Sequence, residues 1–213
     1  MLRRFAIITE TDARQIEYGA TVELAAGGHV TPLARDTLNA RRVTVVPAGS
    51  FDPALPPDLA PAADIRRVAI ASDHTGLALR KAIVQHLRGR GLAVEDFGTD
   101  DTTPVDYPDT AARVAKAVAR GEADAGIVID GAGIGSAIAA NKIKGVRAAM
   151  CTDETLARYS REHNGANVIA LGATLLSGSD AAIRIIDVWL GTPMKEARYI
   201  RRLAKIKRLE EGY

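Results

Sequence analysis

Hydrophobic positions after residue 66 fall into short apolar runs, separated by longer segments in which apolar residues recur every three or four positions. The runs are typical of buried strands and the intervening segments of amphipathic helices. Strands that alternate with helices predict an α/β fold with a parallel sheet covered on both faces. The expected strands are RRVAIASD, LAVEDFG, AGIVID, VRAAMC and NVIALG, and the expected helices span approximately 77–88, 110–120, 136–143, 154–162, 180–190 and 195–211.

Before residue 66 the pattern differs. Residues 47–65 are rich in proline, with almost no apolar periodicity, and predict an extended linker between a small extension, 1–46, and a main domain, 66–213. In the extension, FAII and VTVV predict strands, and TPLARDTLNAR predicts a short helix with Pro32 at its first position. About 45 residues bury too little area to be robust alone. We therefore expect the extension to dock on the main domain, a second subunit or an outside partner.

Composition excludes several classes of protein. The formal charge of +2, from 28 basic and 26 acidic residues, is too balanced to indicate a nucleic-acid partner. The apolar runs are too short to span a membrane, and no signal-peptide pattern opens the chain. A single cysteine, Cys151, excludes an intrachain disulfide and fits a reducing cytoplasm. The four histidines are scattered, so no metal site is predicted.

In parallel sheets, ligands bind beyond the carboxyl ends of the strands. The first main-domain strand ends in Asp73-His74, a pair that favours a polar site, although Asp73 could simply cap the helix that begins near Gly76.

The third strand ends in Asp130, followed by glycines at 131, 133 and 135. Glycines let backbone N–H groups approach an oxyanion, and the following helix adds favourable partial charge. A dinucleotide-binding loop is the nearest alternative, because Asp153 falls about twenty residues further on. The spacing is GxGxG rather than GxGxxG, and the loop follows the third strand rather than the first, which argues against that alternative.

Two further groups stand near helix ends. His163 and Asn164 precede the last strand, where they fit either a site or a helix stop with Asn164-Gly165 as its cap. Arg198 and Arg202 are four apart on the last helix and could form a fork for phosphate. Apolar residues recur every three positions along this helix and predict its buried stripe, Ile200, Leu203, Ile206 and Leu209.

Six blocks between about Arg67 and Leu209 together resemble one family: VAIASDHTG, DYPD, GIVIDGAGIGSAIAANKIKGVRAA, SREHNGANVIALG, DVWLGT and EARYIRRL. They resemble the type B ribose-5-phosphate isomerases and their galactose-6-phosphate isomerase relatives. The resemblance implies a Rossmann-like three-layer sandwich with a five-stranded parallel sheet, and a homodimer or dimer of dimers whose sites are shared across the interface. It also implies metal-free isomerisation of a sugar phosphate without a cofactor, most simply ribose 5-phosphate to ribulose 5-phosphate through an enediolate.

The family's roles carry over residue by residue. Asp73, His74 and Tyr107 match positions that line the sugar site, and His163 matches the histidine that assists ring opening, accompanied by Asn164. The predicted phosphate ligands are Arg198 and Arg202, and the predicted enediolate-binding loop contains Gly131, Gly133 and Gly135.

The chain differs from the family at the positions that supply and assist the catalytic base. Many members have a cysteine where this chain has Asp130, another branch has a glutamate where it has Ser136, and a helping hydroxyl is replaced by Ala132. We predict that Asp130 is the general base, because burial can make a carboxylate a stronger base than it is in water. The alternatives are a non-catalytic or weakly active sugar-phosphate binder, and a galactose-6-phosphate isomerase-like subunit that needs a partner subunit.

The block GGHVTPLARDTLNARRVTV in the extension resembles short N-terminal stretches of enzymes associated with bacterial microcompartments. This resemblance implies that residues 1–46 contact shell or cargo proteins and place the enzyme inside a microcompartment. The alternative is an oligomerisation arm that packs on a neighbouring subunit.

Overall fold

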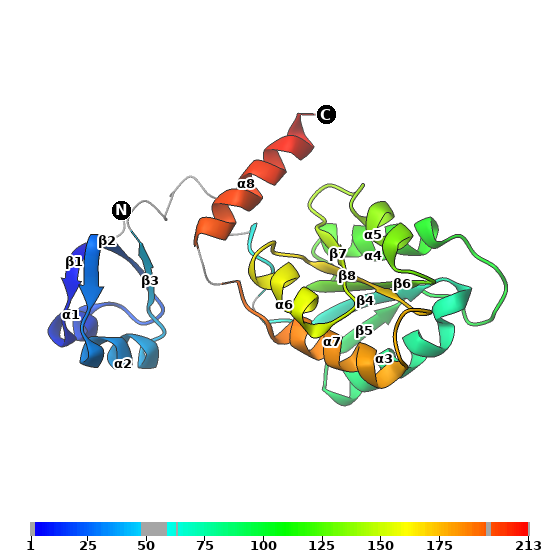
Figure 1. The fold of residues 1–213 in the computed structure, drawn as a ribbon, viewed down its shortest axis with the longest axis horizontal. Coiled ribbons are helices and arrows are strands. Elements are labelled where there is room, and N and C mark those ends of the chain that lie inside the picture. The colour runs from blue at the N-terminus through cyan, green and yellow to red at the C-terminus, as the bar shows by residue number, and fades with distance from the viewer. Residues whose placement is uncertain (1–2, 48–58, 63, 195–196, 213) are drawn as a thin grey trace. The chain divides into compact units, whose positions relative to one another are not determined.

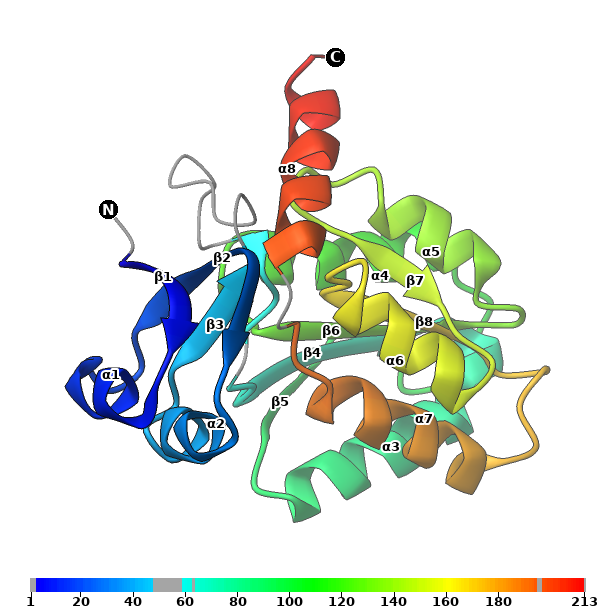
Figure 2. The same ribbon diagram turned by 60° about the vertical axis from the view of Figure 1, so that its left-hand side comes forward.

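The computed structural model describes residues 3–47, 59–62, 64–194 and 197–212 (Figure 1, Figure 2). Contacts divide the chain into two compact units, one of residues 1–57 with 196–204 and one of residues 58–195 with 205–213. Among the described residues, no helix combines the length and apolarity needed to cross a bilayer.

The first unit contains a three-stranded parallel sheet in the order β1-β2-β3. Its elements are β1 (Arg4–Ile8), α1 (Glu10–Gln15), β2 (Thr21–Val30), α2 (Pro32–Ala40) and β3 (Thr44–Pro47). The two predicted strands and the helix that begins at Pro32 are confirmed, whereas β2 was not predicted. A small apolar cluster fills this unit; its buried members are Ile8, Ala13, Ile16, Val22, Ala34, Leu38 and Val43.

The second unit contains a five-stranded sheet in which every paired strand is parallel, in the order β5-β4-β6-β8-β7. The strands are β4 (Arg67–Ser72), β5 (Ala93–Asp96), β6 (Ala125–Asp130), β7 (Ala148–Met150) and β8 (Val168–Gly172). The helices are η2 (His74–Gly76), α3 (Leu77–Gly89), α4 (Tyr107–Ala119), α5 (Ile134–Ala140), α6 (Glu154–Glu162), α7 (Ser179–Gly191) and, divided between the units, α8 (Ala197–Glu211). Every strand and helix predicted after residue 66 is present, and the predicted fold class is confirmed.

The two faces of the five-stranded sheet have different cores, because side chains alternate along each strand. Val68 and Ile70 belong to a cluster of large aliphatic residues under α3, α6 and α7. Ala69 and Ala71 belong to an alanine-rich cluster under α4 and α5, the helices seen on the opposite face in Figure 1. The small side chains let α4 and α5 approach the sheet closely. Burial of each large aliphatic side chain on the other face contributes roughly 1.5–3 kcal/mol.

Most of the predicted linker, 47–65, lies outside the described residues, but two arginines bind its final part. The Arg147 guanidinium donates to the carbonyl of Leu59, and that of Arg161 donates to the carbonyl of Ala62, both at 3.0 Å. Arg161 is fully buried and lies 4.9 Å from the centre of the Trp189 ring. Burial lowers its pKa to about 10, so it stays charged at neutral pH. The end of the linker is therefore built into the second unit.

The apolar stripe predicted for α8 is only partly buried. Leu203 is buried, but Ile206 and Leu209 are exposed. The prediction was wrong for the second half of the helix, because three-residue spacing shows that apolar side chains share a face but not that the same chain covers it.

Candidate active site

The order of the five strands places a topological switch point between β4 and β6. From β4 the chain moves to the edge strand β5 and then crosses back to β6 on the other side of β4. Loops diverge at such a switch point, which is where open α/β sheets bind ligands. Asp73 follows β4 and Asp130 ends β6. The Asp73 N–H donates to the carbonyl of Ile129 at 3.1 Å, so the two strand ends adjoin.

The Asp130 carboxylate folds back onto its own glycine loop. Its Oδ1 accepts the N–H groups of Ala132, at 2.9 Å, and of Gly133, and its Oδ2 accepts the N–H of Ser136 at 2.7 Å. The residue is only 4% exposed. The anion that this loop holds is therefore the protein's own carboxylate. A carboxylate has about four acceptor positions, and these N–H groups use three of them.

The glycine loop is fastened to the end of β8. Gly133 has a φ of +77°, and a Cβ there would lie 2.8 Å from the carbonyl carbon of Leu171. The hydroxyl of Thr174 donates to the carbonyl of Gly131 at 2.6 Å, and the N–H of Ala173 donates to that of Asp130 at 2.8 Å. Positive φ together with this close approach restricts position 133 to glycine. The glycine loop is therefore fixed both by the Asp130 carboxylate and by residues at the end of β8.

Asp73 uses one carboxylate oxygen to cap η2. Oδ1 accepts the N–H and hydroxyl of Thr75, at 2.9 and 2.5 Å, and the N–H of Gly76 at 3.3 Å. The capping alternative for Asp73 is therefore realised. All three of these hydrogen bonds go to Oδ1, and none of them uses Oδ2.

Two more predicted residues lie at the same edge. His74 is half-buried, and its Nδ1 accepts the N–H of Val105 at 3.4 Å. Tyr107 begins α4 and is partly exposed, and a Cβ on Gly135 would lie 2.5 Å from its ring. The structure therefore brings Asp73, His74, Tyr107, Asp130 and the glycine loop to one edge of the sheet.

His163 and Asn164 lie at the opposite edge. His163 ends α6, where its ring stacks on that of Tyr159 with centroids 4.7 Å apart, and the Asn164 amide donates to the Tyr159 carbonyl at 3.3 Å. β8 begins soon afterwards and runs toward the site, with Val168 paired to Gly126 and Gly172 paired to Asp130. Four residues of strand span roughly 13 Å. Within one chain, His163 is thus separated from Asp130 by the length of the strand.

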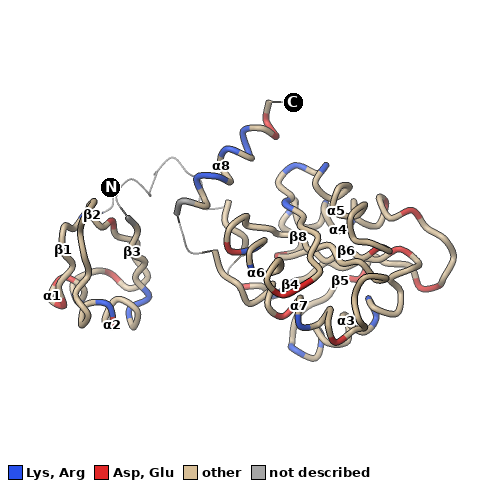
Figure 3. Tube along the Cα trace, viewed as in Figure 1, with Lys and Arg blue, Asp and Glu red and all other residues tan. Residues whose placement is uncertain are grey.

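The predicted phosphate-binding pair lies on α8, whose basic residues are prominent in Figure 3. The side chain of Arg198 lies outside the described residues. Arg202 is exposed, and its guanidinium lies 5.5 Å from the centre of the Tyr199 ring. This part of α8 groups with the first unit and the strand ends with the second, so the phosphate-binding role stays a prediction.

Cys151 and Asp153 do not contribute reactive groups to this edge. Asp153 is the aspartate whose spacing suggested a dinucleotide-binding loop. Cys151 is buried after β7, where burial raises its pKa to about 11. Asp153 caps α6 by accepting the N–H groups of Thr155 and Leu156, each at 2.8 Å. Among the residues that the structure describes, no cluster of three or more His, Cys, Asp or Glu is placed to hold a metal ion.

The sequence did not identify two parts of this site. The Ser136 amide binds Asp130, and Thr174 fixes the glycine loop to β8. A serine inside a helix and a threonine beyond a strand carry no signal at the sequence level, because both act through folding of the loop.

The fold agrees with comparisons to known proteins. Residues 68–206 match the model of the Ribose/Galactose Isomerase family. This match covers more than half of the chain, which therefore belongs to that family of sugar-phosphate isomerases.

Within this family, the chain is similar to several ribose-5-phosphate isomerases B. The chain is 42% identical over 147 residues to ribose-5-phosphate isomerase B of Escherichia coli, covering 69% of this chain and 98% of that protein. The structure of ribose-5-phosphate isomerase B from Clostridium thermocellum is 48% identical, with a TM-score of 0.67 over 69% of this chain and 99% of the other. The enzyme from Mycoplasma genitalium, solved with bound ribulose-5-phosphate, is 40% identical, with a TM-score of 0.66 over 69% and 97% of the two chains.

Proposed function

We propose that this chain is an aldose–ketose isomerase that interconverts ribose 5-phosphate and ribulose 5-phosphate. The observation that carries the proposal is the 42% identity across 98% of the Escherichia coli ribose-5-phosphate isomerase B. The convergence of Asp73, His74, Tyr107 and Asp130 at the switch point supports it.

The reaction needs a base and a place for negative charge. A base removes the proton from C2 of the open-chain aldose, the electron pair forms an enediolate, and the proton returns to C1 while the hydroxyl protons rearrange. Electrons move only within the substrate, so no external oxidant or reductant is required. General acid–base catalysis of this kind contributes typically ~100- to 10,000-fold.

Asp130 is the proposed base. Its Oδ2 accepts one N–H, from Ser136, whereas Oδ1 accepts two, so Oδ2 carries the open acceptor position. Asp73, which keeps Oδ2 outside its cap, is proposed to bind the sugar hydroxyls with His74 and Tyr107. Arg198 and Arg202 are proposed to bind the phosphate.

A homodimer, or a dimer of dimers, would complete the site. His163 and Asn164 lie a strand's length from Asp130 in one chain, so we propose that a second copy supplies them. Ile134 and Ile138, four apart on α5 beside the glycine loop, are 55% and 57% exposed and offer an apolar contact for that copy. Mixing Asp130→Ala with His163→Ala chains should then restore activity that neither has alone, whereas no recovery after subunit exchange would contradict a shared site.

The direct test is turnover of ribose 5-phosphate by the pure chain in D₂O, followed by NMR. We expect ribulose 5-phosphate to form and deuterium to enter the carbon-bound positions, since the base exchanges its proton with solvent. Allose and galactose phosphates, run in parallel, define the substrate. Absence of product with all three sugars would reject the isomerase.

A sugar-phosphate binder without turnover is the second candidate, and one observation favours it. Asp130 replaces the cysteine of many relatives, and loop amides already occupy most of its carboxylate. Binding of ribose 5-phosphate without product would support this candidate. Activity that appears only with a second, non-identical subunit would instead indicate a galactose-6-phosphate isomerase-like subunit.

The extension before the isomerase domain is proposed to deliver the enzyme to a bacterial microcompartment. The family match begins at residue 68, so the extension lies outside it. Deleting the residues before Arg66 should abolish co-purification with shell or cargo proteins. Unchanged association would contradict delivery, and a change in subunit number alone would indicate an oligomerisation arm.

A further inference from the structure

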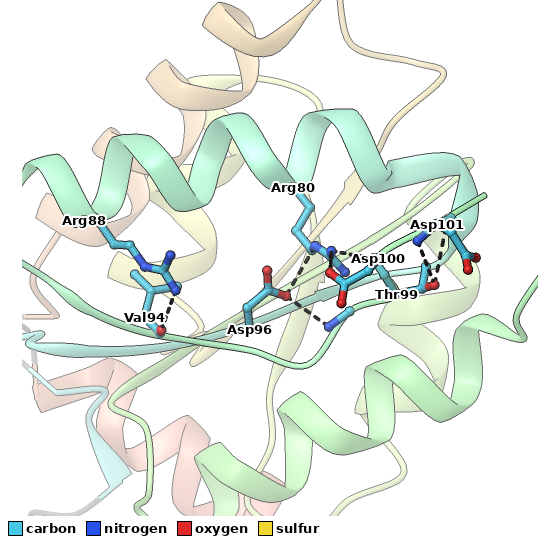
Figure 4. Close-up of polar contacts among 8 residues, drawn as sticks. Arg80, Arg88, Val94, Asp96, Thr99, Asp100 and Asp101 are labelled. Atoms are coloured by element: carbon cyan, nitrogen blue, oxygen red, sulfur yellow. Dashed lines mark hydrogen bonds and ion pairs between the residues drawn. The ribbon is translucent and has the colours of Figure 1, made fainter. Parts of the chain in front are cut away.

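Helix α3 contains a buried arginine, Arg80. The side chain of Arg80 is only 1% exposed, although a guanidinium is always charged. Such side chains are almost never fully buried unless they are paired. Figure 4 shows Arg80 pointing from α3 toward the segment that follows β5.

The partners of Arg80 lie at the end of β5 and in the turn that follows it. Its Nη2 donates to the carbonyl of Thr99 at 2.5 Å, and its Nε lies 3.3 Å from Oδ1 of Asp96, an ion-pair distance without hydrogen-bond geometry. The same Asp96 oxygen accepts the N–H of Gly98 at 3.0 Å. The Arg80 guanidinium and the Asp96 carboxylate thus both bind the backbone of this turn (Figure 4).

Gly98 is shaped to receive the guanidinium. A Cβ on this glycine would lie 1.2 Å from Nη1 and 2.2 Å from Cζ of Arg80. Glycine is needed here for close approach to a side chain, because no room exists for both a methyl group and the guanidinium.

The loop that leaves this turn ends at the candidate active site. Its own hydrogen bonds are local, such as that from the Thr103 N–H to the Asp101 carboxylate at 2.8 Å. Further on, the N–H of Val105 donates to Nδ1 of His74 at 3.4 Å. Tyr107 follows and lies against Gly135. The loop is therefore anchored by Arg80 at one end and by site residues at the other.

We propose that Arg80 is a positioning residue that fixes the turn at residues 96–100 and, through the loop after it, the contacts of Val105 with His74 and of Tyr107 with Gly135. The proposal rests on the proposed function, in which His74 and Tyr107 contact the sugar. Arg80 itself touches no reacting atom.

The effect on His74 can be measured without turnover. An Nδ1 that accepts a hydrogen bond carries no proton, so the ¹⁵N NMR spectrum of the imidazole reports the contact with Val105. In ligand-free Arg80→Met we expect the His74 Nδ1 signal to shift or broaden. Arg80→Lys, which keeps the charge, should restore it in part. Arg88→Met is the matched control, because Arg88 is an exposed arginine on the same helix whose Nη2 donates to the carbonyl of Val94 at 3.5 Å.

Kinetics test the link to catalysis. Because small misplacement of contacting groups is costly, we expect kcat/KM for ribose 5-phosphate to fall about 10- to 100-fold in Arg80→Met, to fall less in Arg80→Lys and to hold in Arg88→Met. Thermal melts of each variant identify the temperature at which all are folded.

Gly98 provides an independent perturbation of the same contact. Gly98→Ala should alter the His74 spectrum and lower kcat/KM by displacing the guanidinium. In an Arg80→Ala background the same substitution should cost little, because the group with which it collides is gone. Strict additivity of the two changes would contradict the proposal.

An unchanged His74 spectrum in folded Arg80→Met would overturn the proposal whatever the kinetics. If Arg80→Met does not fold, Arg80→Lys and Gly98→Ala give the same decision from the same signal. A wild-type chain without isomerase activity would reject the proposed function, yet a His74 signal that responds to Arg80 and not to Arg88 would still support the positioning role.

Discussion

The turns after β4 and β6 each place a buried aspartate before a helix, but they engage its carboxylate differently. Asp73 accepts its three hydrogen bonds on one oxygen, from the last two residues of η2. Asp130 accepts three backbone N–H groups on both oxygens, two from the glycine loop and one from the first turn of α5. The first carboxylate has an oxygen to spare, whereas the second organises the loop around itself. Asp130 is therefore both the proposed base and a structural centre.

Removal of the Asp130 carboxylate should have the largest effect. Asp130→Ala leaves the N–H groups of Ala132, Gly133 and Ser136 without their acceptor. Each buried donor left unsatisfied costs ~1–3 kcal/mol, so we expect the free energy of unfolding to fall by about 3 kcal/mol or more, with loss of isomerase activity. Urea denaturation and a coupled assay measure the two effects. Full stability would contradict the structural part of this role.

The matching change at the other turn should separate activity from stability. Asp73→Asn keeps an oxygen that can accept the Thr75 N–H, so the free energy of unfolding should change by less than about 1 kcal/mol. Loss of the charge on the oxygen that we propose to contact the sugar should lower kcat/KM by ~100-fold. An equal loss in stability and activity, measured by the same two methods, would mean that Asp73, like Asp130, holds its turn together.

How tightly the loop is held against β8 can be tested at Gly133. Gly133→Ala forces an L-residue to a φ of +77° and brings its Cβ within 2.9 Å of the Gly172 nitrogen. We expect a cost of about 2 kcal/mol or more. Gly121→Ala is the control, because Gly121 also has a positive φ, of +69°, but a Cβ there meets nothing within 4 Å. Equal destabilisation would mean that backbone conformation alone accounts for the cost.

A carboxylate far from the site should show the smallest effect. Asp124 precedes β6; burial alone would raise its pKa, but hydrogen bonds from the Arg67 side chain and from the Arg66 and Arg67 N–H groups lower it overall. A lowered pKa gives stability that is present above the unfolded value near 4 and is lost as the pH falls through the folded value. Asp124→Asn should cost about 1 kcal/mol at pH 7 and weaken the acid dependence in urea titrations between pH 7 and 2, with kcat unchanged. A change in kcat would contradict its separation from the site.

The sequence predicted the strands, helices and polar strand ends because apolar periodicity and glycine spacing are local signals. It did not predict whether the Asp130 carboxylate points beyond the strand end or back to the amides of its own loop, because both arrangements bury the same residue. Arg80 was missed because an arginine in a helix pattern usually faces solvent, although Gly98 was a weak indication of a close approach. The separation of His163 from Asp130 follows from the direction of β8, because His163 precedes this strand whereas Asp130 lies at the end of β6. The order of the elements already implied this separation, but the family resemblance grouped the two residues in one site.

Sulfur chemistry is absent from the proposed reaction, because the single thiol of the chain, Cys151, is buried after β7 and a carboxylate ends β6. Peroxides and electrophiles inactivate enzymes chiefly by attacking accessible thiolates. We therefore expect this isomerase to keep its activity under oxidative stress that inactivates enzymes whose base is an accessible cysteine.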